Sequence, residues 1–314
     1  MLRGSLHPAR QHQRIRYLKA NTGSPSERHM PFESNKDVLE WYERQPRTLT
    51  PEFVSSIPWH EVKDHPVDQR LIPVLLYMRD VETLTDMYHR EMLRTPTGRD
   101  PYISKFMERW GLEEMDHAHL LNRFLSEAGV DTDDKWQAKV RGEVPAAYNA
   151  SAYLATTLAN LIGSKFTASH MTFGAIHEMS TTQGYRQVIK LARHPVLTQL
   201  LSAIIREESA HTQFYWSIAR LELKKNEFAR RIARFVVEHF WKPVGQGSLP
   251  KKRTEYLIST LFGNDDGLAL LDTTLTQRLR RLPGFDDVTK INETLERICR
   301  NAFAPALAGR ALAD

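Results

Sequence analysis

Two segments of this chain carry the same pair of polar residues inside an otherwise apolar helical stripe. Positions 110, 114, 117, 121, 124 and 128 read Trp, Glu, His, Leu, Phe and Ala. Positions 197, 201, 204, 208, 211, 215 and 218 read Leu, Leu, Ile, Glu, His, Tyr and Ile. Steps of three and four residues keep each set on one face of a helix. Both core-facing stripes are therefore interrupted by the spacing Glu-x-x-His.

Two further apolar stripes each contain a single acid. One expected helix places on a common face Met171, Gly174, Glu178, Thr181, Tyr185 and Val188. Another places on a common face Leu75, Met78, Glu82, Thr85, His89 and Met92. Four helices are thus predicted to direct one carboxylate each toward a shared core, and two of them add an imidazole.

Buried carboxylates require compensation, and these stripes contain no Lys or Arg. Two divalent cations would balance four carboxylates, and oxygen and imidazole ligands without thiolate suit iron or manganese better than zinc. Two helices that each supply a Glu, with two that each supply Glu-x-x-His, can build a dinuclear site in a four-helix bundle. The predicted ligands are Glu82, Glu114, His117, Glu178, Glu208 and His211.

Glu-x-x-His is a short motif that also occurs by chance, so the prediction of a metal site depends on where the two copies lie and not on their number. Each copy lies in the middle of a helix and follows a second acid, Glu113 or Glu207. The alternative is a core in which hydrogen bonds satisfy these polar residues. The other histidines near the stripes are expected to be hydrogen-bonded or at the surface; they are His89, His119, His170 and His177.

The rest of the chain also has a helical pattern, without alternating stretches longer than a few residues. The expected helices cover 36–45, 67–93, 103–128, 146–192 and 195–225, with basic amphipathic helices over 226–314. Pro73 is expected to kink the second helix, and Gly129 to end the third. Gly163, Gly174 and Gly184 are expected to weaken the helix over 146–192. The fold class is predicted to be all-α, with 31–314 as one domain.

Composition excludes several other classes of protein. The 314 residues contain one cysteine, Cys299, so neither a disulfide framework nor a multi-cysteine metal site can form within the chain. No apolar run approaches the roughly 18 residues of a membrane span. Lys and Arg number 43 against 38 Asp and Glu, an excess that favours acidic partners. Nucleic acid, an anionic membrane and an acidic carrier protein all remain open on composition alone.

The first 26 residues contain no acid and carry five basic side chains. They lack the apolar segment of a secretory signal. The region 1–30 is predicted to be a basic, disordered arm or an upstream extension before Met30, and an organelle transit peptide is the alternative.

Glu113–Asp131 (EEMDHAHLLNRFLSEAGVD) resembles the first Glu-x-x-His segment of the soluble acyl-acyl-carrier-protein desaturases. Arg206–Tyr215 (REESAHTQFY) resembles the second, and His177–Thr181 (HEMST) matches the family's Glu-Arg-Ala-Thr element in its Glu and Thr. The resemblance covers about 66–221. It implies a ferritin-like four-helix bundle core with additional flanking helices. The arginine of that element is absent and the loop between the first two helices is shorter, which leaves the substrate identity open.

The resemblance also implies residue roles. The six predicted ligands match the family's iron ligands, with a register gap of one or two residues at Glu82. Thr181 matches a hydroxyl residue beside bound dioxygen, and Glu207 matches an acid that orients a ligand histidine on the electron path. Trp59 corresponds to a surface tryptophan of that path.

The resemblance implies a cytoplasmic, homodimeric di-iron desaturase that uses O2, acyl carrier protein and a ferredoxin-type donor, without nucleic acid or a membrane span. The alternative is a di-iron hydroxylase or N-oxygenase acting on a carrier-bound or free small molecule. An iron-storage protein and a ribonucleotide-reductase radical subunit fit less well, because of the long C-terminal extension and because 110–128 contains no Tyr. A basic docking surface for acidic partners is predicted at Lys224, Lys225, Arg230, Arg231, Arg234, Lys251, Lys252 and Arg253.

Overall fold

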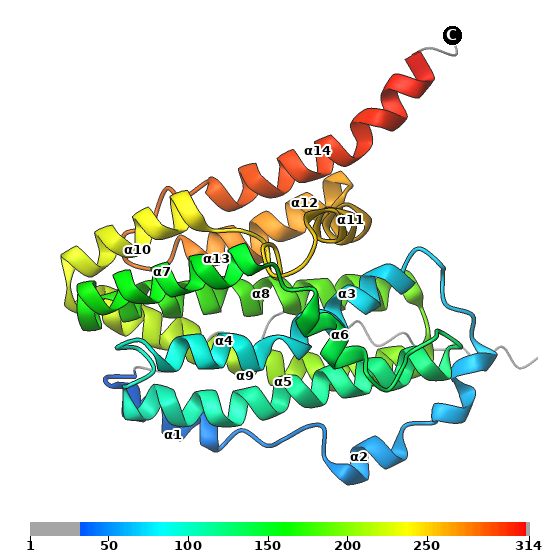
Figure 1. The fold of residues 1–314 in the computed structure, drawn as a ribbon, viewed down its shortest axis with the longest axis horizontal. Helices are drawn as coiled ribbons and strands as arrows, with labels where there is room; N and C mark the ends of the chain where they lie inside the picture. Colours follow the sequence, from blue (N-terminus) through cyan, green and yellow to red (C-terminus); the bar gives the residue numbers. More distant parts are fainter. Residues whose placement is uncertain (1–31, 312–314) are drawn as a thin grey trace, which may run out of the picture. The chain divides into compact units, whose positions relative to one another are not determined.

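The computed structural model describes the backbone of residues 32–311 and the side chains of residues 32–302 (Figure 1). Within these residues every regular element is helical, apart from one isolated bridge between Gln246 and Leu249. The prediction of an all-α fold is therefore confirmed. The basic arm predicted over 1–30 lies outside the described residues.

The helices follow one another with short connections. In chain order they are α1 (Asn35–Glu43), α2 (Pro51–Ser56), η1 (Trp59–Asp64), α3 (Ile72–Thr83), α4 (Thr85–Leu93), α5 (Pro101–Glu127), α6 (Trp136–Gly142), α7 (Ala146–Ile162), η2 (Gly163–Phe166), α8 (Thr167–Ala192), α9 (Pro195–Lys225), α10 (Glu227–Phe240), α11 (Lys251–Phe262), α12 (Asp265–Leu271), η3 (Asp272–Thr276), α13 (Gln277–Leu279) and α14 (Lys290–Ala311).

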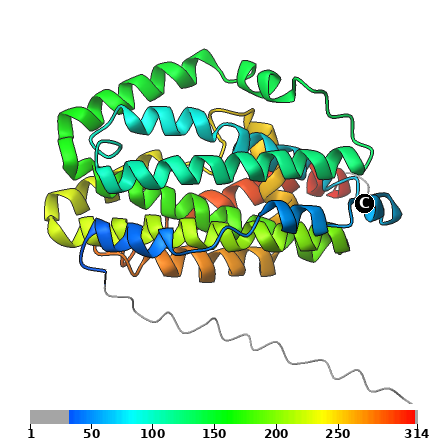
Figure 2. The ribbon, with the colours of Figure 1, turned by 90° about the horizontal axis from the view of Figure 1, so that it is seen from below.

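Four helices enclose the centre of the described fold. α8 packs along α9, α3 packs along α5, and α5 contacts α9. Figures 1 and 2 show α5, α8 and α9 running side by side, with α1 against α5 and α9. The segments that follow α9 pack on the other side of this group, because α10 and η3 contact α8, and α11 contacts both α3 and α8. The four acids of the stripes lie on these four helices, whereas the part of the Glu82 stripe from Thr85 onward lies on α4.

The two Glu-x-x-His helices have well-defined ends. Asp100 caps α5 by accepting hydrogen bonds from the backbone N–H groups of Tyr102 and Ile103, and Pro101 occupies the first turn. Gly129, with φ 81°, follows the end of α5, as predicted. The ring of His194 caps α9 by accepting from the N–H of Leu197. These caps set where each helix begins, and hence which face its Glu and His occupy.

The prediction of a kink at Pro73 is wrong. Pro73 lies in the first turn of α3, where its missing N–H removes no intrahelical hydrogen bond. The helix is interrupted instead at Leu84, whose N–H donates to Val81 O at 3.0 Å in a tightened turn. α4 starts afresh after this turn.

The long helix predicted over 146–192 is two helices. Gly163 ends α7 with φ 78°, a backbone conformation that a residue with a side chain rarely adopts. α8 then runs through Gly174 and Gly184 without a break. At Gly174 an added Cβ would lie 2.2 Å from the ring of Tyr215 on α9, so this glycine permits close packing of the two helices.

Candidate metal centre

The six predicted ligands meet in the interior, although they come from four helices. α3 contributes Glu82, α5 contributes Glu114 and His117, α8 contributes Glu178, and α9 contributes Glu208 and His211. All six are buried. Because each stripe faces the same core, residues separated by up to 129 positions in the sequence come together.

The six side chains form two overlapping groups of four. One group contains Glu82, Glu114, His117 and Glu208, and the other contains Glu114, Glu178, Glu208 and His211. Within each group the potential ligand atoms lie within 4.8 Å of one another. Glu114 and Glu208 belong to both groups. This arrangement can hold two metal ions, with these two carboxylates placed to bridge them.

Both histidines turn the same ring nitrogen toward the carboxylates. His117 Nδ1 lies 3.2 Å from an oxygen of Glu114 and 3.2 Å from an oxygen of Glu208. His211 Nδ1 lies 3.1 Å from the other oxygen of Glu114. Nδ1 is therefore the nitrogen available to a metal ion in each ring, and Nε2 points outward.

The outward nitrogens contact a second pair of buried acids. His117 Nε2 lies 3.1 Å from Glu207, and His211 Nε2 lies 2.7 Å from Glu113. An ionised carboxylate can only accept, so each imidazole donates from Nε2, and a metal ion at the centre would bind the Nδ1 lone pair of each ring. Such hydrogen bonds fix the orientation of metal-binding histidines. Glu207 thus contacts one predicted ligand histidine, and Glu113 contacts the other in the same way.

These outer acids are stabilised by groups that the sequence patterns did not single out. Glu113 contacts the guanidinium groups of Arg47 and Arg109 and accepts a 2.5 Å hydrogen bond from Tyr42 OH. Glu207 contacts Arg47 and accepts from the backbone N–H groups of residues 48 and 49. Arg47 and both N–H groups come from the connection between α1 and α2, for which no sequence motif exists.

The two remaining acids each accept a hydrogen bond from an aromatic side chain. Trp110 Nε1 donates to Glu178 Oε1 at 3.0 Å, and Tyr185 OH donates to Glu82 Oε1 at 2.5 Å. Each bond leaves the second oxygen of the carboxylate available. Trp110 lies on the stripe of Glu114, and Tyr185 lies on the stripe of Glu178. A polar aromatic residue on an acid-bearing stripe could have been predicted to donate a hydrogen bond to an acid of a neighbouring helix.

The protonation of the centre reflects its excess of acids. Burial, followed by repulsion from Glu114 and Glu208, raises the pKa of Glu82 and of Glu178 well above the ordinary value. Burial opposes the charged form of His117, yet its hydrogen bonds to carboxylates raise its pKa well above the ordinary value. Without metal ions, protons must supply the missing positive charge.

The residues fit a pair of divalent cations. Both oxygens of Glu208 and Nδ1 of His211 are buried without a hydrogen-bond partner, as expected of atoms that serve as metal ligands. Four inner carboxylates balance two divalent ions, while Arg47 and Arg109 balance the two outer acids. The donor set contains oxygen and nitrogen without sulfur, which suits iron or manganese.

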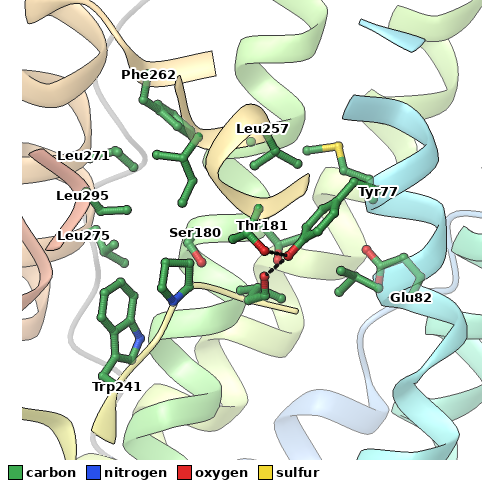
Figure 3. Close-up of a pocket in the computed structure, with 17 residues that line it drawn as sticks. Tyr77, Glu82, Ser180, Thr181, Trp241, Leu257, Phe262, Leu271, Leu275 and Leu295 are labelled. Atoms are coloured by element: carbon green, nitrogen blue, oxygen red, sulfur yellow. Dashed lines mark hydrogen bonds between the residues drawn. The ribbon is translucent and has the colours of Figure 1, made fainter. Parts of the chain in front are cut away.

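An apolar cavity approaches the centre from the side of α3 and α8. Both Glu82 and Thr181 line it. Figure 3 shows these two residues opposite Leu271, Leu275 and Leu295. Thr181 and Glu82 therefore line the same cavity, from α8 and α3.

The other candidate residues lie elsewhere. Trp59 is buried rather than at the surface, because its indole N–H donates to Val54 O and Arg123 covers its ring at 4.1 Å. His89, His119, His170 and His177 are not among the residues that form the two groups. Of these, His170 contacts Thr97, and His119 contacts Gln137.

The predicted basic docking surface is largely compensated by acids. Ion pairs join Lys225 to Glu222, Arg231 to Glu227, Arg234 to Glu238, Lys251 to Glu255, and Arg253 to Asp80. Such pairs along a helix reduce the net field that an acidic partner would experience. Lys251 and Arg253 begin α11, whose next turns line the cavity.

No protein-family model, curated protein or solved structure matches this chain. Within the described residues, no helix is both long enough and apolar enough to cross a membrane. The function is therefore inferred from the geometry of the buried centre.

Proposed function

We propose that this chain is a di-iron, dioxygen-dependent desaturase with a ferritin-like core, acting on an acyl chain attached to acyl carrier protein. The observation that best supports this proposal is the apolar cavity lined by Glu82, which belongs to one of the two four-residue groups that could hold a metal ion. A reduced di-iron pair supplies, with dioxygen, an oxidant strong enough for an unactivated methylene group. An apolar lining suits a hydrocarbon chain and excludes water from the reacting carbon.

The protein's own residues have separate tasks in this proposal. Glu113 and Glu207 hold the two histidines, and Glu114 and Glu208, which belong to both four-residue groups, would help to hold both ions. Thr181 offers a hydroxyl that can donate to or accept from a polar group in the cavity. α11 begins with Lys251, Lys252 and Arg253 and continues into cavity residues Thr254 and Leu257, so an acidic carrier would meet basic side chains on a helix that lines the cavity.

A single preparation tests the proposed function. Protein loaded anaerobically with iron is analysed for iron per chain, then exposed to oxygen with an electron donor and acylated carrier protein. We expect two irons per chain and a product lighter by two hydrogens. A product heavier by one oxygen would favour the oxygenase, bulk iron mineral would favour storage, and absence of bound iron would contradict all three.

The wall of the cavity offers a test of substrate binding. A Cβ at Gly184 would lie 2.8 Å from Met78 Cε, so Gly184→Val should push this side chain into the cavity. Loss of space for about one methylene group is expected to lower kcat/KM for the longest accepted chain at least tenfold. Iron per chain should not change, since neither residue belongs to the metal-binding groups.

Gly142→Val is the matched control, because a Cβ there has no neighbour within 4 Å. Equal kinetics of the Gly184→Val variant and the native protein on chains of every length would place the substrate elsewhere.

The expected homodimer also has a candidate surface. α7 exposes Leu154, Leu158 and Leu161 while its inner side carries Thr156 and Ala159, and its 17 residues contain no charged side chain. An isologous contact brings identical groups together, so an uncharged apolar helix suits a second copy of the chain better than an acidic partner. We expect Leu158→Glu to halve the mass measured by light scattering. Leu191→Glu, at the end of α8, is the control, and a monomeric native protein would contradict this expectation.

A further inference from the structure

One guanidinium group lies between the two acids that orient the histidines. Arg47 Nε is 3.2 Å from Glu113 Oε1 and 3.3 Å from Glu207 Oε1. Its Nη2 is 2.5 Å from Asp116 Oδ2. Arg47 therefore contacts α5 and α9 at the same time, from a connection that belongs to neither helix.

The two acids serve the two histidines in a crossed manner. Glu113 on α5 contacts His211 on α9, while Glu207 on α9 contacts His117 on α5. The group with His117 and the group with His211 would each hold one metal ion. A displacement of Arg47 would consequently reach both ion positions, through two different carboxylates.

Glu113 and Glu207 differ in how much of their compensating positive charge comes from Arg47. Glu113 has a second guanidinium partner, because Arg109 Nε lies 2.8 Å from its Oε1. Among the described residues, the only arginine paired with Glu207 is Arg47, and the other contacts of Glu207 are with His117 Nε2 and the backbone N–H groups of residues 48 and 49. Loss of the Arg47 side chain would leave the buried Glu207 carboxylate with one fewer positive charge to hold it in place.

The backbone of the connection is anchored independently of this side chain. Thr48 Oγ1 donates to Ala203 O at 2.7 Å, and its N–H donates to Glu207 at 2.7 Å. The Arg47 side chain is itself about one-third exposed, at 34 %. A substitution at position 47 should therefore alter the contacts of the guanidinium group without unfolding the chain.

From this geometry we propose that Arg47 is a positioning residue shared by both metal positions: it orients His117 through Glu207 and His211 through Glu113. The inference rests on the proposed dinuclear centre. It goes beyond that centre in assigning one residue of the α1–α2 connection to both halves.

Stepwise titration of the metal-free protein with Co²⁺, followed by calorimetry and visible absorption, tests the inference without turnover. Outer contacts of ligand histidines typically contribute 10- to 100-fold to metal affinity. We expect Arg47→Gln to weaken both binding steps within this range, and the step that involves His117 more strongly, because Glu113 retains its contact with Arg109. Glu207→Gln is expected to weaken mainly one step, because Glu207 contacts only one of the two histidines.

Arg47→Lys separates charge from geometry. A lysine ammonium is a single point charge and cannot reproduce the contacts of Nε with Glu113 and Glu207 together with the contact of Nη2 with Asp116. We therefore expect partial recovery of one binding step but not of both. Arg123→Gln on α5 is the matched control, because Arg123 pairs with Glu127 and covers Trp59, away from the outer acids.

The outcomes distinguish this inference from the proposed centre. Native protein that binds fewer than two Co²⁺ ions would contradict the dinuclear centre itself. Native protein that binds two ions, together with an Arg47→Gln variant in which one step or neither is weakened, would overturn the shared role of Arg47. Unchanged thermal unfolding of the metal-free Arg47→Gln variant verifies that the effect arises from the metal sites.

Discussion

Glu208→Gln is expected to leave the protein unable to hold two metal ions, and to lower turnover by more than about a hundredfold. Glu208 is completely buried, belongs to both four-residue groups, and has two oxygens without hydrogen-bond partners. A glutamine at this position replaces one oxygen by an NH2 group, which cannot bind a cation, and removes one of four balancing charges. Metal analysis of the purified variant should show one ion per chain or none.

The metal-free form distinguishes loss of ligation from loss of folding. Without cations, contacts with His117 and His211 outweigh burial and repulsion from Glu114 and lower the pKa of Glu208. Neutral glutamine loses part of this stabilisation, so the metal-free variant is expected to unfold cooperatively at a somewhat lower temperature than the metal-free native chain. Glu222→Gln, also on α9, is the control, because Glu222 pairs with Lys225 near the end of the helix. Two tightly bound ions in Glu208→Gln would contradict a bridging role.

The stabilisation conferred by metal is expected to increase as pH rises from about 5 to about 8. Ligands bind metal in their deprotonated forms, so metal competes with protons at the centre. A free ion concentration about a thousand times the Kd would contribute about 4 kcal/mol to the free energy of unfolding. At roughly 2–4 °C per kcal/mol this corresponds to about 10 °C in Tm.

The direction follows from the pKa shifts of the metal-free chain. Burial and neighbouring acids raise the pKa of Glu82 and Glu178, and carboxylate contacts overcome burial to raise the pKa of His117 and His211. A group whose pKa is raised by folding stabilises the fold at low pH and loses that contribution as pH rises through its folded pKa. The metal-free protein should therefore become less stable toward pH 8.

The acids with lowered pKa act in a different range. Contacts with histidine overcome burial to lower the pKa of Glu114 and Glu208, and they bring the pKa of Glu207 to about 2. Their contribution to stability is present above the ordinary carboxylate pKa and is lost only as pH falls below it. Between about pH 5 and 8 they contribute a constant amount.

Paired thermal scans across this pH range provide the measurement. Metal-free Glu82→Gln and Glu178→Gln variants mimic the protonated carboxyl groups, and each should flatten the pH dependence. A difference in Tm between loaded and metal-free protein that shrinks with rising pH would show that protons and metal do not compete at this centre.

The predicted ligands could be obtained from the sequence because their spacing is local. Glu114 and His117 are separated by one helical turn, as are Glu208 and His211, so the spacing alone places each pair on one face. The apolar residues around them identified that face as the buried one. Glu82 was assigned by the same argument even though its helix ends one residue later than Glu82 itself.

Predictions that depended on the path of the backbone were less successful. Pro73 begins a helix instead of kinking one. Gly163 ends one helix of the predicted segment, whereas Gly174 and Gly184 lie within the next helix and permit close approach of Tyr215 and Met78. The sequence reports the conformational preference of a residue, whereas the neighbours that make a break or a close approach favourable come from distant segments.

By itself the sequence determined the all-α class, the four acid-bearing stripes and the six side chains predicted to bind metal, since helical periodicity repeats every few residues. Only the tertiary structure decided which atoms surround those side chains. Arg47 reaches Glu207 across 160 positions of sequence, and the cavity brings Glu82 together with leucines of η3 and α14. Such contacts depend on how separate helices pack, and no local pattern encodes them.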